Sequence, residues 1–349
     1  MKVLHLAAGN RWTGAAAPAF AEVEALRGAG IDAHYAYVGG YKLEQKIGHL
    51  DFVHPAIGKA QSPLAFRRSL RALDALMHVH GFDILHAHLT YDHWLARILA
   101  RDHNVRLART FHSRRVLRTD FITRGLIRKT PLLFVINEEF RDAPAFGGRG
   151  AVFTPPPLDL RQFSANGADV RAQYGIAKEE RLVTVIGKLS KGRGFEEALQ
   201  TFALLHRTMP ATRMMIIGHG EHRPALESFA ASLQIAPHVI WAGYHEDDLA
   251  EHYRASDLLL FTARGSDEGH RAVLEAMACG VPVAAYPLEG MRALVEQVAS
   301  AATPEALSFL AASLLARDGA TLRAAAIARS HGFDYTHAAR RLIAAYLPQ

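Results

Sequence analysis

The sequence predicts an α/β protein with two doubly wound parallel sheets. Short apolar segments rich in Val, Ile and Leu alternate with segments of helical character, a pattern typical of parallel strands that helices cover on both faces. At residues 154–163 the segment TPPPLDLRQF interrupts this alternation, because three successive prolines fit neither a helix nor a central strand. The length of 349 residues exceeds the usual size of one core, so we expect two domains joined by this linker.

Before the linker, β-type segments alternate with loops and helices. Helices are expected at residues 15–29 and 91–103. The strands expected here are KVLHLAA, IDAHYAYV, FDILHAH, RLARTFH and PLLFVIN, at residues 2–8, 31–38, 82–88, 106–112 and 131–137.

After the linker the same alternation resumes. Helices are expected to begin near residues 193, 221 and 246, and a further helix bears Glu275. The strands expected here are RLVTVIGK, TRMMIIG, HVIWAG, DLLLFTA and VPVAAY, at residues 181–188, 212–218, 238–243, 257–263 and 281–286. Two such domains flank a cleft, and ligands of these sheets bind at the carboxyl ends of the strands.

Composition indicates a cytoplasmic protein. The single cysteine, Cys279, excludes an intramolecular disulfide and lies in a small-residue helix, so we interpret it as a packed thiol in a reducing compartment. No segment reaches the roughly 18 apolar residues of a membrane span. The first residues, MKVLHLAAGN, are too short and too broken to form a signal peptide.

Positive charge is concentrated in the first half of a chain whose formal net charge is +6. The segment at residues 106–129 contains eight cations and one acid, and FRRSLRAL adds Arg67, Arg68 and Arg71. One interpretation is a solvated basic face. The other is a surface for an anionic partner, either acidic lipid headgroups or a phosphate-bearing acceptor. Nucleic acid is not expected, because stacking aromatics are not interleaved with these cations.

The turn after residues 181–186 combines glycines with cations. In IGKLSKGRG, Gly187 ends the strand, and Lys188, Lys191 and Arg193 follow among further glycines. Glycines let the backbone approach a ligand closely, and cations at such a turn clamp phosphate oxygens. The alternative is a merely polar turn. The GxxxxGK[ST] spacing of a phosphate-binding P-loop is absent.

Two further strand ends carry weaker indications. Gly218 begins a Gly-x-Gly pair after one strand, without the third glycine of a dinucleotide site. Gly243 and Tyr244 follow the next strand. A two-domain dehydrogenase remains an alternative, although its glycine signature is missing.

The segment SDEGHRAVLEAMACGVPV at residues 266–283 places two acids eight residues apart. Glu275 lies among apolar residues, where a carboxylate needs a partner. A helix that starts near Gly269–Arg271 presents free N–H groups to phosphate or sugar oxygens. Ionised carboxylates are acceptors that hold vicinal hydroxyl pairs. This chemistry predicts one acid for a ribose, the other for a sugar, and the N–H groups between them for a diphosphate.

In these segments the chain resembles retaining glycosyltransferases of family 4, which have the GT-B fold. DEGHRAVLEAMACGVPV stands where the family reads EGFGLxxLEAMAxGxPV, and IGKLSKGRG stands where it reads VGRLxxxKG. The resemblance runs from about residue 3 to residue 346 and is strongest in the second half. It implies two Rossmann-like domains facing a cleft, an acceptor-binding domain at 1–156 and a nucleotide-sugar-binding domain at 157–333. It also implies a helix at 334–349 that crosses back to the first domain.

The resemblance also implies roles for individual residues. Lys188 and Arg193 clamp the donor diphosphate with their cation types exchanged, and Asp267 is one methylene shorter than the family's Glu. His112 faces the donor sugar, while His86 and His88 are interpreted as structural. The residues implied as catalytic are His112, Lys188, Arg193 and Asp267. The residues implied in donor binding are Gly14, Gly187, Lys188, Arg193, Gly218, Gly243, Tyr244, Asp267, Glu268, Gly269, His270, Arg271, Ala272 and Glu275.

The activity that the resemblance implies is transfer of a hexosyl unit from a nucleotide-diphosphate sugar with retention of configuration. A UDP-sugar is favoured, with GDP-mannose next, and the acceptor is a hydroxyl of a glycan or lipid-linked molecule in cell-surface polysaccharide or glycolipid biosynthesis. The basic first half suggests peripheral contact with the inner face of an anionic membrane. Neither a cofactor nor a metal is expected, and among the 20 histidines no metal-spaced cluster stands out. The alternatives are a non-catalytic nucleotide-sugar-binding module and a catalytically weakened relative.

Overall fold

The computed structural model describes residues 1–9, 15–59, 62–263 and 269–347. The chain forms two compact units, each with its own parallel sheet. The first unit comprises Met1–Pro157, Asp267–Gly269 and Phe333–Gln349, and the second comprises Leu158–Ser266 and His270–Gly332. The chain thus passes from the first unit to the second inside the proline-rich segment, between Pro157 and Leu158.

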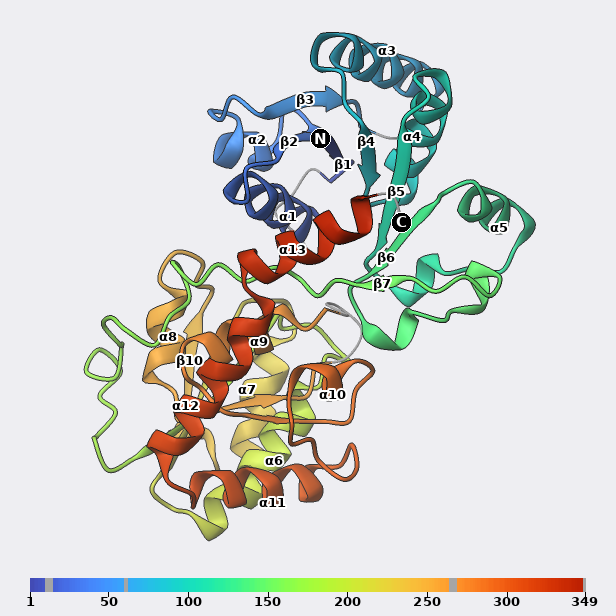
Figure 1. Cartoon of the computed structure of the whole chain (residues 1–349). Coiled ribbons are helices and arrows are strands. Elements are labelled where there is room, and N and C mark those ends of the chain that lie inside the picture. The colour runs from blue at the N-terminus through green and yellow to red at the C-terminus, as the bar shows by residue number, and fades with distance from the viewer. Residues whose placement is uncertain (10–14, 60–61, 264–268, 348–349) are drawn as a thin grey trace. The chain divides into compact units, whose positions relative to one another are not determined.

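The sheet of the first unit has the strand order β3-β2-β1-β4-β5-β6-β7, and every neighbouring pair is parallel (Figure 1). The order turns back between β1 and β4, as in doubly wound folds. The strands are β1 Lys2–Ala7, β2 Asp32–Val38, β3 Val53–Ile57, β4 Ile84–Ala87, β5 Arg106–Phe111, β6 Leu132–Val135 and β7 Val152–Phe153.

Two of these strands were not expected from the sequence. β3 contains Pro55, which lacks an N–H donor, and the sheet accommodates it because β3 lies at the edge. β7 has only two residues, too few for a periodic pattern. The prediction of parallel α/β sheets is confirmed.

Helices cover both faces of the first sheet. α1 and α13 lie on one face, where Phe20, Val23 and Leu342 are buried, and α3 and α4 lie on the other, where Leu73 and Leu99 are buried. α13 also packs on α1 through small residues (Figure 1). The helices of this unit are α1 Ala16–Gly28, α2 Lys42–Ile47, α3 Pro63–His80, α4 Thr90–Asp102, α5 Phe121–Arg128 and α13 Tyr335–Tyr346.

The second unit contains a five-stranded parallel sheet of order β10-β9-β8-β11-β12. Phe195, Phe202 and Leu226 fill its main core, together with apolar residues of the strands. The strands are β8 Arg181–Ile186, β9 Thr212–Ile217, β10 Val239–Gly243, β11 Leu258–Phe261 and β12 Val283–Ala285. The helices are α6 Phe195–Thr208, α7 Arg223–Ser232, α8 Leu249–Ala255, α9 Arg271–Ala278, α10 Met291–Leu294, α11 Pro304–Leu315 and α12 Gly319–Ser330.

Across the described residues, no helix has both the length and the apolar character needed to cross a bilayer. Cys279 is buried at the end of α9, and burial raises the pKa of its thiol to about 12. The thiol is therefore protonated at neutral pH, which fits the expected packing role.

Candidate functional site

Three predicted glycines of the second unit meet at the carboxyl ends of neighbouring strands. Gly187 donates its N–H to the carbonyl of Ile217 at 3.0 Å, and Gly218 donates to the carbonyl of Gly243 at 2.6 Å. All three have positive φ, with 153° at Gly187, 142° at Gly218 and 89° at Gly243. Parallel pairing of β8 with β9 and of β9 with β10 brings these turns together, although they are distant in sequence.

Gly218 leaves no room for a side chain. A Cβ atom there would lie 1.9 Å from the carbonyl oxygen of Gly187, which is backbone and cannot rotate away. Gly220 is equally tight, because its Cβ would lie 2.0 Å from the carbonyl oxygen of Leu189. The Gly-x-Gly pair therefore allows the turns after β8 and β9 to pack closely against each other.

The turn after β8 supplies two cations with different surroundings. Lys188 is exposed, and its ammonium group lies 4.0 Å from the carboxylate of the exposed Glu221, so solvent screens that attraction. Arg193 is half-buried, and its Nη1 atom is buried without a hydrogen-bond partner among the described residues. α6 begins directly after Gly194, which makes no side-chain cap, and the first N–H groups of a helix have no acceptor within the helix itself. This turn is suited to an anionic ligand.

Glu275 lies on α9, one turn from the start of the helix, and only 6% of it is exposed. Its Oε1 atom is 3.1 Å from Nε of Arg271 on the same helix. Its Oε2 atom accepts a hydrogen bond of 3.3 Å from the hydroxyl of Tyr253 on α8. The cation and the hydroxyl stabilise the buried carboxylate, and they fix the direction in which its oxygens point.

Arg271 has a partner in the structure that was not expected from the sequence. The resemblance implied charge near the phosphates, and the structure places this guanidinium against Glu275. Ala272, the next predicted residue, is half-buried in the first turn of α9. Tyr244 is largely exposed after β10, and its hydroxyl donates to Glu246 at 2.9 Å.

His270 precedes α9 in a left-handed conformation with φ of 50°. It is buried, and its Nε2 atom is 2.7 Å from the carbonyl oxygen of Glu289, while Nδ1 is buried without a partner among the described residues. Gly269 lies in the first unit, where a Cβ would come within 2.6 Å of Pro156. Both positions thus constrain the backbone that leads into α9.

Three predicted site residues lie outside the described residues: Gly14, Asp267 and Glu268.

His112 belongs to the first unit, directly after β5. Its Nε2 atom is 3.0 Å from Nδ1 of His88, and its Nδ1 atom is buried without a partner among the described residues. Burial, with a smaller contribution from Arg109, lowers the pKa of His112 to about 3, so the imidazole is neutral at physiological pH.

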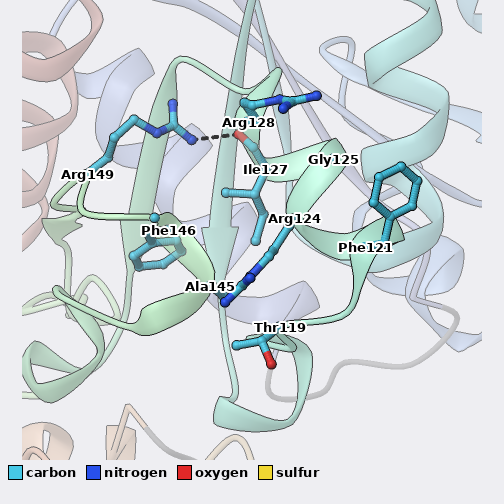
Figure 2. A pocket seen from close by; sticks show the side chains of 10 residues that line it. Thr119, Phe121, Arg124, Gly125, Ile127, Arg128, Ala145, Phe146 and Arg149 are labelled. Atoms are coloured by element: carbon cyan, nitrogen blue, oxygen red, sulfur yellow. Dashed lines mark hydrogen bonds between the residues drawn. The ribbon is translucent and has the colours of Figure 1, made fainter.

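The first unit also contains a pocket that the sequence did not indicate. It has a volume of about 740 Å³ and lies between α5 and the segment at residues 145–149 (Figure 2). Arg124, Arg128 and Arg149 line it together with Phe121 and Phe146, and Arg149 is held by the carbonyl of Ile127 at 2.7 Å. Cations beside aromatic rings suit a ligand with anionic and apolar parts.

One cation of the predicted basic cluster does not contribute to a surface. Arg109 is buried in β5, where the carboxylate of Asp92 attracts it, and the solvated-face interpretation is wrong for this residue. Nothing in the sequence distinguishes Arg109 from the other cations of this segment. Its burial follows from the position of β5 between β4 and β6, where the residues from Leu107 to Phe111 are all buried.

Both halves of the chain match models of known protein families. Residues 12–142 match the family model described as Glycosyltransferase Family 4, and residues 168–310 match the model described as Glycosyl transferases group 1. This chain belongs to glycosyltransferase family 4. The family match includes the strand-end turns at Gly187, Gly218 and Gly243 and the whole of α9.

Relatives of this family 4 chain include several named enzymes. The D-inositol 3-phosphate glycosyltransferase of Segniliparus rotundus is 31% identical over 206 residues, which are 55% of this chain and 45% of that protein. The GDP-mannose-dependent alpha-(1-6)-phosphatidylinositol monomannoside mannosyltransferase of Mycolicibacterium smegmatis is 32% identical over 156 residues, 42% of this chain and 41% of that protein. The chain therefore matches less than half the length of these two relatives.

Solved structures share the fold over almost the whole chain. The Anabaena protein HepE in complex with UDP and glucose has a TM-score of 0.77 at 18% identity, with 99% of this chain and 98% of that chain covered. A glycosyltransferase from Rickettsia africae has a TM-score of 0.82 at 12% identity, with 99% and 97% covered. The family 4 chain thus has the GT-B fold of two Rossmann-like domains.

We predict that Gly218→Ala destabilises the second unit by at least about 2 kcal/mol, because the new Cβ must displace the backbone of Gly187. Urea unfolding of the nucleotide-free protein measures this cost. Gly319→Ala is the matched control, since a Cβ at Gly319 meets no atom within 4 Å. Equal urea midpoints for the two variants would contradict the close approach of the β8 and β9 turns.

Proposed function

We propose that this chain is a retaining glycosyltransferase that moves a hexosyl unit from a nucleotide-diphosphate sugar to a hydroxyl of a glycan or lipid-linked acceptor. The observation that carries the proposal is Glu275, a buried carboxylate held by Arg271 and Tyr253 beside the start of α9. A carboxylate oriented in this way accepts hydrogen bonds from a ribose diol. The strand-end turns with Lys188 and Arg193 supply the cations that a diphosphate needs.

The donor proposed is a UDP-sugar, with GDP-mannose next. HepE, which shares the fold, binds UDP and glucose, and the M. smegmatis relative is GDP-mannose-dependent. Lys188, Arg193 and the N–H groups at the start of α9 are assigned to the diphosphate, and Asp267 is assigned to the sugar. His112, neutral and with Nε2 engaged by His88, presents Nδ1 as its remaining polar atom and is assigned to the donor sugar.

The proposed reaction is a front-face transfer in which the leaving phosphate takes the proton of the incoming hydroxyl. The bond from the anomeric carbon to the phosphate oxygen breaks as the bond to the acceptor oxygen forms on the same face. Lys188 and Arg193 stabilise the negative charge that grows on the diphosphate, and each such donor contributes about 2.7–4 kcal/mol in a site that excludes water. With these cations in place, transfer requires no divalent metal at the diphosphate.

The first test removes the diphosphate cations one at a time. We predict that Lys188→Ala and Arg193→Ala each lower the release of UDP from UDP-glucose in the presence of acceptor at least tenfold, because each loses its charge-assisted contact to the leaving diphosphate. Lys191→Ala is the control, since Lys191 is exposed in the same turn and has no assigned contact.

Near-normal rates in both the Lys188 and Arg193 variants would reject the diphosphate assignment. If wild-type protein binds UDP-glucose but releases no UDP with any acceptor offered, the chain is a nucleotide-sugar-binding module and the proposed transfer is wrong.

The second test separates the two acids. We predict that Glu275→Gln weakens binding of both UDP and UDP-glucose, because the ribose is present in both ligands. Asp267→Asn is expected to leave the affinity for UDP unchanged and to reduce transfer, because its assigned contact is the sugar alone. Calorimetry with each ligand measures the difference, and equal losses in both variants would show that the roles are not divided.

We also propose that the first unit contacts an anionic membrane surface. At the start of α5, Phe121 and Ile122 are 89% and 64% exposed, although both are large and apolar. They line a surface pocket together with Trp94 of α4. Cations surround these side chains, namely Arg97, Arg101, Arg128 and Lys129. Exposed apolar side chains ringed by cations fit the boundary between headgroups and acyl chains.

The membrane contact predicts a specific loss of vesicle binding. Phe121→Ala combined with Ile122→Ala should reduce partitioning onto phosphatidylglycerol vesicles, and raising the salt concentration should weaken what remains, because each cation near the surface contributes about 1 kcal/mol that ions screen. Phe309→Ala is the matched control, since Phe309 is 79% exposed on α11 of the second unit. Equal partitioning of wild-type protein onto neutral and anionic vesicles would support the solvated-face interpretation.

A further inference from the structure

Four buried polar side chains converge inside the first unit. His5 comes from β1, Glu22 from α1, His86 from β4 and His88 from the residue after β4. The three histidines are fully buried and Glu22 is 1% exposed. One ligand atom from each of the four lies within 4.8 Å of all the others. None of the four is among the residues assigned to the donor.

The separations among these atoms are close to those of a tetrahedral metal site. Oε2 of Glu22 is 3.6 Å from Nδ1 of His5, 3.7 Å from Nε2 of His88 and 4.0 Å from Nδ1 of His86. Nδ1 of His5 is 2.9 Å from Nε2 of His88. Ligands held at about 2.0–2.1 Å around a tetrahedral zinc ion are roughly 3.3 Å apart, so the observed distances lie on both sides of that value.

Each of the three histidines uses its other ring nitrogen for an outer partner. Nε2 of His5 is 3.3 Å from the hydroxyl of Tyr346, and Nε2 of His86 is 2.7 Å from the hydroxyl of Thr110. Nδ1 of His88 is 3.0 Å from Nε2 of His112. Such partners fix the tautomer of a histidine and direct the lone pair of its inner nitrogen toward a metal.

The inner oxygen of Glu22 gives a second, independent observation. Oε2 is buried and accepts no hydrogen bond from any described residue. A buried carboxylate without a compensating partner is costly, and one nitrogen of each of the three histidines lies 3.6 to 4.0 Å from this oxygen. A cation between these nitrogens and the oxygen removes that cost.

We propose that His5, Glu22, His86 and His88 bind one divalent zinc ion. Three imidazole nitrogens and one carboxylate oxygen are ligands that zinc accepts in a closed tetrahedral site, whereas calcium and magnesium prefer all-oxygen ligands. The burial of all four residues leaves no open position for water, so the ion has a structural role. It connects β1, β4 and α1 directly, and α13 through Tyr346.

Burial affects the ionisation of all four side chains. It lowers the pKa of His5 to about 3 and the pKa values of His86 and His88 well below their usual range, which keeps the three imidazoles neutral at pH 7. It raises the pKa of Glu22, because a charged carboxylate is costly in this environment without a compensating cation.

Two contacts compete with the metal. Nδ1 of His86 lies 2.5 Å from the Tyr346 hydroxyl, and the 2.9 Å contact between His5 and His88 is itself a hydrogen bond in the metal-free site. The buried guanidinium of Arg109 adds opposing positive charge, which the carboxylate of Asp92 offsets. The alternative occupant of this space is therefore a metal-free histidine network, and the experiment must separate the two.

The experiment uses the full chain. Because the site is buried, zinc is removed with a chelator in urea and restored during refolding. We expect one zinc per chain by elemental analysis of protein made in zinc-supplemented medium, and a tetrahedral Co²⁺ absorption spectrum after refolding with cobalt. Zinc at 100-fold above its Kd should raise Tm by at least about 5 °C.

Glu22→Gln tests the assignment because it keeps the shape of the side chain and removes the anionic oxygen. We expect this variant and His88→Gln to lose the cobalt spectrum and the rise in Tm, with zinc affinity reduced at least about tenfold. His78→Ala is the control for adventitious binding, since His78 belongs to a partly exposed group with Asp74 and His103. It should bind zinc as the wild-type protein does.

Three outcomes would overturn the proposal. They are refolded wild-type protein that binds no zinc, a stoichiometric cobalt spectrum that survives both Glu22→Gln and His88→Gln, and zinc binding that His78→Ala abolishes. If either variant at the site fails to refold, the metal content of the other decides. All of these readouts are independent of UDP binding and of transfer.

Discussion

The parallel pairing of β8 with its neighbours is the constraint on which the candidate donor site depends. Every strand of this sheet ends at the same edge, so turns that are far apart in the sequence become neighbours. Hydrogen bonds from Gly187 to Ile217 and from Gly218 to Gly243 lock these turns together. The cations of the β8 turn can act on a ligand only because this edge has one fixed geometry.

Much of this arrangement is readable from the sequence, because parallel strands are continuous apolar runs and glycines mark their ends. β3 and β7 were not predicted. Pro55 argues against a strand in β3, and the two residues of β7 are too few to show the alternation of a strand. The i,i+4 spacing of Arg271 and Glu275 was visible, but a salt bridge between them was not anticipated. It depends on Glu275 being buried on the face that α8 covers.

The histidines of the first unit show a different limit to what the sequence can predict. His86 and His88 alternate along one strand and therefore share a face, which the sequence shows. That His5 stands beside His86 depends on the register of β1 against β4, and Glu22 arrives from a helix. Register and helix placement are tertiary facts, so no spacing rule in the chain brings these residues together. The contact of His88 with His112 depends in the same way on the register of β4 against β5.

The position of α13 has a consequence for the order in which the chain folds. This helix completes the core of the first unit, where Leu342 and Tyr346 are buried, yet the ribosome makes it after the whole second unit. At the usual rate of synthesis, roughly 10 to 35 seconds pass between the two parts of the first unit. During that interval the apolar residues that α13 covers in the folded chain, Ala25 of α1 among them, do not yet have their partner helix.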